Sequence, residues 1–146
     1  MPLMDIFDIA GSAMNAQNLR LNTTASNLAN ADSVSSNRGE TYRARHPVFA
    51  ARLAEQTLVG DPRAAAIDQA ATGVMVTGIV ESDAPLQMKY EPHHPMADDN
   101  GYVAYPNVNV VEEMADMMSA SRSFQVNVQM LTTVKSMAER LLSMGQ

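Results

Sequence analysis

The hydrophobic and polar positions repeat with a helical period at the two ends of the chain and lose that period between them. Over residues 5–31 the apolar positions recur every seven residues. A second row at the same spacing is small or polar, so this face offers little apolar surface. The pattern predicts a long N-terminal helix that needs a partner helix for its stability. The apolar row is Phe7, Met14, Leu21 and Leu28, and the small row is Ala10, Gln17, Thr24 and Ala31.

A second long helix is predicted from Val110 to Met144, where apolar residues again recur every seven positions. Asn109 can cap its start, and acidic residues follow in its first turns, where the helix dipole favours negative charge. Helices in globular proteins average about 11–12 residues, so this length indicates a coiled coil or a bundle. The first row is Val110, Met117, Phe124, Leu131 and Ala138, and the second row is Met114, Ser121, Val128, Lys135 and Leu142.

The middle of the chain, residues 32–106, has the pattern of loops and short strands. Strands are predicted over residues 73–80, 86–90 and 101–105, and a turn at residues 81–85 is expected to join the first two strands as a hairpin. Residues 41–45 are expected to begin a strand, residues 49–59 fit either a strand or a short helix, and residues 60–73 are expected to form a loop. The prediction is therefore an α+β fold in which the helices of residues 1–31 and 107–146 pair as a coiled coil, with residues 32–106 as a small β-rich unit.

Composition and charge limit the classes of function that the chain can have. The chain has 146 residues, which suffice for one domain or for a small domain with helical extensions. Its net charge of −6 includes no basic stripe, which argues against binding to nucleic acid. Cysteine is absent, so disulfides and thiolate metal sites are excluded. The acidic Asp5 and Asp8 and the lack of a basic n-region predict that no secretory signal is cleaved.

Candidate chemistry is sparse. His93 and His94 lie between prolines, where a solvated turn is the favoured interpretation. Residues 98–101 resemble part of a calcium loop, but the EF-hand register would place Met96 and Asn107 at the first and last ligand positions. An Asx turn explains this segment better. Because no phosphate-binding glycine loop, nucleophile elbow or HExxH pair is present, we expect no enzyme activity, metal, cofactor or small-molecule substrate.

Several strings of residues resemble the bacterial flagellar rod and hook proteins, and among these the proximal-rod type. The family signature is matched by Ser26-Asn27-Leu28-Ala29-Asn30 followed by Tyr42-Arg43. The resemblance covers nearly the whole chain and is poorest over residues 49–72. Further matching strings are Leu21 to Ser33, Tyr90-Glu91-Pro92, His94-Pro95, Asn100 to Val108, Glu112-Glu113-Met114 and Ser119 to Phe124.

This resemblance implies a structural subunit rather than an enzyme. Such a subunit would polymerise helically in the periplasm, join the membrane ring and export gate to the distal rod and hook, and transmit motor torque. It would leave the cell through the flagellar type III export apparatus without a cleaved signal. The implied partners are other copies of the chain, the other proximal and distal rod proteins, the hook–basal body junction protein and the export apparatus. The terminal helices would form the inner coiled-coil domain.

Two sets of residues are candidates for assembly. Asn27, Asn30, Tyr42 and Arg43 are hypothesised to fix the exit of the N-terminal helix and its contact with a neighbouring subunit. An equally open alternative is that they only cap the helix of their own chain. The apolar set is Phe7, Met14, Leu21, Leu28, Met117, Phe124 and Leu131.

Two other functional classes remain open at this point. A cytoplasmic coiled-coil adaptor would show the same heptads. An enzyme acting on peptidoglycan would need paired acids in a cleft, and the sequence leaves no domain-sized stretch for one.

Overall fold

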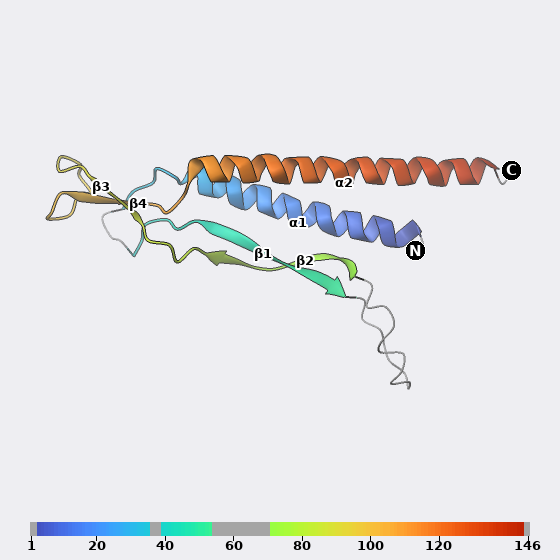
Figure 1. The fold of residues 1–146 in the computed structure, drawn as a ribbon, viewed down its shortest axis with the longest axis horizontal. Helices are drawn as coiled ribbons and strands as arrows, with labels where there is room; N and C mark the ends of the chain where they lie inside the picture. The colour runs from blue at the N-terminus through green and yellow to red at the C-terminus, as the bar shows by residue number, and fades with distance from the viewer. Residues whose placement is uncertain (1–2, 36–38, 54–70, 145–146) are drawn as a thin grey trace, which may run out of the picture.

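The computed structural model describes residues 3–35, 39–53 and 71–144. It is an α+β fold, as expected, with two long helices and two small antiparallel sheets in the described residues. In the elongated molecule of Figure 1, α1 lies between α2 on one side and the β1–β2 sheet on the other. The elements are α1 (Leu3–Ala29), β1 (Arg45–Leu53), β2 (Ala71–Glu81), β3 (Gln87–Tyr90), β4 (Tyr102–Tyr105) and α2 (Val110–Met144).

The two helices pack side by side and run in opposite directions, so the start of α1 and the end of α2 lie at the same end of the molecule (Figure 1). Asn109 caps α2 as predicted, because its Oδ1 accepts a hydrogen bond from the backbone nitrogen of Val111 at 3.2 Å. Arg20 of α1 and Asp116 of α2 form an ion pair of 2.6 Å across the helix contact.

Small side chains form the closest part of this contact. Among the described elements α2 contacts only α1, so the complete burial of Ala120 and the burial of Val134 are due to α1. The second predicted row of α2 is largely outside the contact, and Met114 and Leu142 are 52% and 75% exposed. The buried positions belong to a different row, which consists of Glu113, Ala120 and Val134. The helices meet along this row because the small side chain of alanine lets two helix backbones approach more closely than leucine or methionine would.

The expected hairpin between residues 73–80 and 86–90 is wrong. β2 pairs antiparallel with β1, in a register that joins Arg45 to Glu81, and β3 pairs with β4. A turn was expected at residues 81–85, but Glu81 ends β2. The carbonyl oxygens of Ser82 and Ala84 accept hydrogen bonds from the side chains of Arg43 and Asn107. A turn pattern in the local sequence cannot predict hydrogen bonds to residues that lie 39 and 23 positions away along the chain.

In the remaining middle segment, residues 49–53 form a strand, which was one of the two alternatives, whereas residues 71–72 were expected to belong to a loop and belong to a strand instead. Residues 49–53 and 71–72 belong to β1 and β2, and residues 54–70 lie outside the described part of the chain. The Asx turn is confirmed, since Asp98 Oδ1 accepts hydrogen bonds from the backbone nitrogens of Asn100 and Tyr102. Gly101 has a φ of +80°, and a Cβ there would lie 2.9 Å from Tyr90. None of the described helices is long and apolar enough to cross a membrane.

Candidate assembly site

Asn27, near the C-terminal end of α1, is completely buried and connects three parts of the fold. Its Nδ2 donates hydrogen bonds to the carbonyl oxygen of Arg45 at 2.8 Å and to Oε1 of Glu113 at 2.9 Å. Its Oδ1 accepts hydrogen bonds from the Tyr42 hydroxyl at 2.8 Å and from the Arg45 backbone nitrogen at 2.9 Å. An amide offers two donors and two acceptor positions, so all of them are used. The side chain ties α1 to α2 and to the start of β1.

The other predicted polar residues lie around this point but make different contacts. The Tyr42 hydroxyl is also 3.2 Å from Ser26 Oγ, so Tyr42 and Asn27 belong to one network. Asn30 Nδ2 donates instead to the carbonyl oxygen of Ser26, in the last turns of its own helix. Arg43 directs its guanidinium to the carbonyl oxygen of Ser82 at 3.1 Å. The structure thus brings Asn27 and Tyr42 together and assigns Asn30 and Arg43 to neighbouring but separate bonds.

Glu113 completes the network, although it was not among the residues predicted from the sequence. The residue is 4% exposed, and its Oε2 has no hydrogen-bond partner among the described residues. Burial raises the pKa of this carboxyl group above its usual value, and the hydrogen bond from Asn27 and the nearby His46 lower it to a lesser extent. The signal available in the sequence was its place in the row with Ala120 and Val134. We name Asn27, Tyr42, Arg45 and Glu113 the junction.

This shift in pKa predicts a specific dependence of stability on pH. Because folding raises the pKa of Glu113, the folded chain binds a proton more tightly than the unfolded chain. The resulting stabilisation is complete below the usual carboxyl pKa and is lost as the pH rises through the raised value. Relative to Glu113→Gln, the wild type should therefore gain free energy of unfolding from neutral to mildly acidic pH, as measured by urea denaturation. Glu112→Gln, at an exposed neighbour, should keep the wild-type profile, and parallel profiles for wild type and Glu113→Gln would contradict the prediction.

The predicted apolar residues are all partly exposed. This applies on α1 and on α2 alike, so the helix pair does not fully cover them. They are Phe7, Met14, Leu21 and Leu28 on α1, and Met117, Phe124 and Leu131 on α2.

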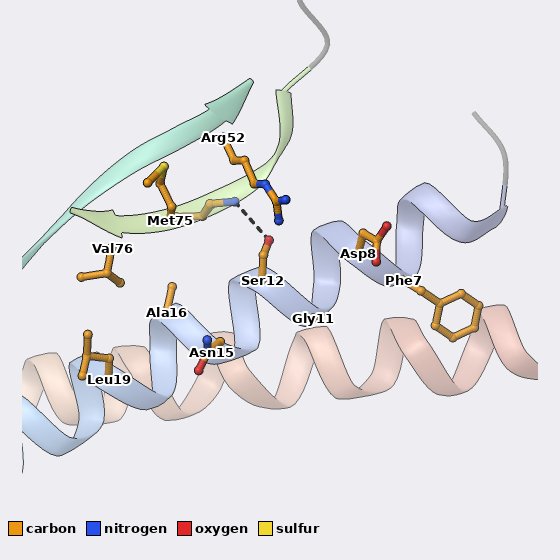
Figure 2. A pocket seen from close by; sticks show the side chains of 11 residues that line it. Phe7, Asp8, Gly11, Ser12, Asn15, Ala16, Leu19, Arg52, Met75 and Val76 are labelled. Atoms are coloured by element: carbon orange, nitrogen blue, oxygen red, sulfur yellow. Dashed lines mark hydrogen bonds between the residues drawn. The ribbon is translucent and has the colours of Figure 1, made fainter. Parts of the chain in front are cut away.

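A groove of about 820 Å³ lies between α1 and β2 (Figure 2). Ser12 joins its two walls, because its Oγ accepts a hydrogen bond from the backbone nitrogen of Val74 at 3.1 Å. Phe7, Ala16 and Leu19 line the groove from α1, and Met75 and Val76 line it from β2. Sequence periodicity could not reveal this groove, because it depends on how the sheet lies against the helix.

Both ends of the chain match models of flagellar rod proteins. Residues 7–35 match the family described as "Flagella basal body rod protein", and residues 99–144 match the "Flagellar basal body rod FlgEFG protein C-terminal" family. Asn27 lies in the first match and Glu113 in the second. The chain therefore matches the flagellar basal-body rod class at both ends, and this class consists of structural proteins rather than enzymes.

Full-length relatives narrow the class further. The chain is 52% identical to the flagellar basal-body rod protein FlgC of Salmonella typhimurium and 51% identical to that of Escherichia coli O6:H1, each over 146 residues and 100% of both chains. It is 35% identical to FlgC of Borreliella burgdorferi over 151 residues, covering 100% of this chain and 99% of the relative. This chain belongs to the FlgC family of flagellar basal-body rod proteins. The comparisons support neither the adaptor nor the enzyme.

Proposed function

We propose that this chain is a subunit of the proximal rod, which polymerises helically, links the membrane ring and export gate to the distal rod, and transmits torque for motility. The full-length similarity to FlgC proteins carries the proposal. The exposed apolar surface of α2 supports it, because isolated soluble proteins seldom leave such surface uncovered. A contact between unlike faces of identical subunits that does not close produces a helical filament.

We also propose that residues 1–31 and 107–146 pair as an inner coiled-coil domain, with residues 32–106 outside it. The antiparallel packing of α1 and α2 supports this division, as does the spacing of Glu113, Ala120 and Val134 by seven and fourteen residues. The apolar residues named above would serve the contacts between subunits.

The polar residues have two possible roles. Asn27, Tyr42 and Arg43 are proposed to fix the exit of α1 and its contact with a neighbour, since the junction sits where both helices meet the β strands. At Asn30 the alternative, capping of its own helix, is favoured by the hydrogen bond to Ser26.

The proposed partners follow from this place in the flagellum. They are other copies of this chain, the other proximal and distal rod proteins, the hook–basal body junction protein and the flagellar type III export apparatus. The proposed location is the periplasmic part of the basal body, reached without cleavage of a signal peptide. Mass spectrometry of the subunit from purified basal bodies would identify its mature N-terminus.

Electron microscopy of basal bodies from a strain that lacks the gene tests the proposed function. We expect membrane rings with no rod, hook or filament above them, and restoration of all three by the gene on a plasmid. A plasmid that carries the gene with an early stop codon is the matched control and should restore none of them. Complete basal bodies and normal swimming in the deletion strain would overturn the proposal.

A further inference from the structure

The groove between α1 and β2 has the shape and lining of a site for a helix. Its α1 wall runs from Phe7 to Leu19, which corresponds to about 18 Å at 1.5 Å per residue. Its lining mixes apolar and polar side chains. Val76 and Leu19 lie close to Ala16 (Figure 2), and Asp8 is exposed at the Phe7 end. Polar groups are supplied by Ser12, Asn15 and Arg52. Grooves that offer apolar surface bind amphipathic helices through side chains spaced three, four and seven residues apart.

α2 carries an uncovered apolar stripe that fits these requirements. Its four members are 45% to 62% exposed and follow one another on the same side of the helix at intervals of four, seven and four residues. The stripe spans about 22 Å, close to the length of the groove. Exposed arginines flank it, with Arg122 one turn before its start and Arg140 beside its end. The stripe consists of Val126, Met130, Met137 and Leu141.

The direction of the helices and the charges at their ends are consistent with α2 of a neighbouring copy lying antiparallel to α1 along the groove. In subunits that point the same way, α2 of a neighbour would run antiparallel to α1, as α2 does within one chain (Figure 1). If Val126 lies at the Leu19 end of the groove, Met130 reaches Asn15, and Arg140 of the neighbour comes within reach of Asp8. Opposite charges would then meet at the end of the groove where the sequence supplies an exposed acid.

We infer that the groove between α1 and β2 of one subunit receives the Val126–Leu141 stripe of α2 from a second copy of this chain. The inference rests on the proposed function and assigns one of its contacts between subunits. The contact joins unlike surfaces, so it repeats from copy to copy.

The arrangement also places neighbouring copies at different heights. The hydrogen bond between Asn27 and Glu113 sets the level of the two helices, so Asn15 is level with residue 125 of its own α2. Contact with Met130 of the neighbour requires a shift of about five residues, or about 7.5 Å along the axis. Such a shift leads to a helical row of subunits rather than a flat closed ring.

Disulfide cross-linking tests the inference directly, because the chain has no cysteine of its own. The variants Asn15→Cys and Met130→Cys are expressed together in one deletion strain. The cells are oxidised before basal bodies are purified. We expect a cross-linked dimer that contains one of each variant, identified by mass spectrometry of the joined peptides. Asn15→Cys with Met118→Cys is the matched control, since Met118 is exposed on a different side of α2, and it should give no dimer.

The outcomes separate this inference from the proposed function. Swimming cells with complete rods but without the Asn15–Met130 dimer would overturn the groove contact and leave the rod subunit in place. Cross-linking of Asn15→Cys to a different protein would also overturn it, because another partner would then occupy the groove. If a cysteine variant does not assemble, a charge exchange replaces it: Asp8→Arg and Arg140→Asp should each reduce the swimming halo, and the double variant should restore it. Failure of the double variant to swim better than either single variant would contradict the contact.

Discussion

Replacement of Asn27 by alanine is expected to lower the free energy of unfolding by about 3–5 kcal/mol, because it removes the four hydrogen bonds of a completely buried side chain at once and leaves the buried Glu113 carboxylate without a partner among the described residues. The Arg45 backbone nitrogen and the Tyr42 hydroxyl would each lose an acceptor, and the Glu113 carboxylate would lose its hydrogen bond from Asn27. Each uncompensated buried group costs about 1–3 kcal/mol. Urea denaturation followed by circular dichroism measures the loss.

Asn22→Ala is the matched control for Asn27→Ala. Asn22 lies on the same helix and is exposed, and its side chain donates a hydrogen bond to Asn18 Oδ1 at 3.3 Å. Its replacement should change the free energy of unfolding by less than about 0.5 kcal/mol. In cells, Asn27→Ala should abolish swimming while Asn22→Ala retains it. Equal effects of the two substitutions on stability would show that the junction does not hold the helices together.

Enlargement of Ala120 to leucine is expected to have the second largest effect. Ala120 is completely buried by α1, so the extra methyl groups have no space without moving the helices apart. Overpacking of this kind costs about 1–3 kcal/mol, and alanine and leucine have similar helix propensities, so the loss comes from the contact itself.

Ala115→Leu, at an exposed position of the same helix, distinguishes an effect on the packing of the two helices from an effect on the stability of α2 itself. It should stay within about 0.5 kcal/mol of the wild type in urea denaturation. If Ala120→Leu were as stable as the wild type, the two helices would not be in close contact at this position.

The two long helices could be predicted because their apolar positions repeat over many turns. The predicted N-terminal helix, residues 5–31, differs from α1 by only two residues at each end, a difference usual for helix ends. The predicted start of the second helix at Val110 is confirmed by the cap at Asn109. Strand β4 and its Asx turn were also found, because the acid, asparagine and glycine of a tight turn are adjacent in sequence.

The sheet pairing could not be predicted in the same way. The turn pattern of residues 81–85 suggested a local hairpin, yet β2 pairs with β1 across an intervening stretch of chain. Glu113 was missed for a related reason. Near a helix start an acid is favoured by the helix dipole, so its position there does not separate Glu113 from its exposed neighbour Glu112. Its place in the row of Ala120 and Val134 and its burial against Asn27 do so. The prediction of Asn27 came from a family signature, and its four hydrogen bonds came from the fold.

The junction joins residues 86 positions apart, and this separation has a consequence for the time at which the fold forms. While the chain emerges from a ribosome, or from any narrow passage that it leaves end first, one helix is outside long before the other. The asparagines and the glycine of α1 lower its helix propensity, so we expect α1 to stay largely unfolded during that interval. Contacts between distant residues also form slowly. The order of the elements along the chain therefore delays folding, and the helical surface of the subunit is complete only after almost all of the chain has emerged.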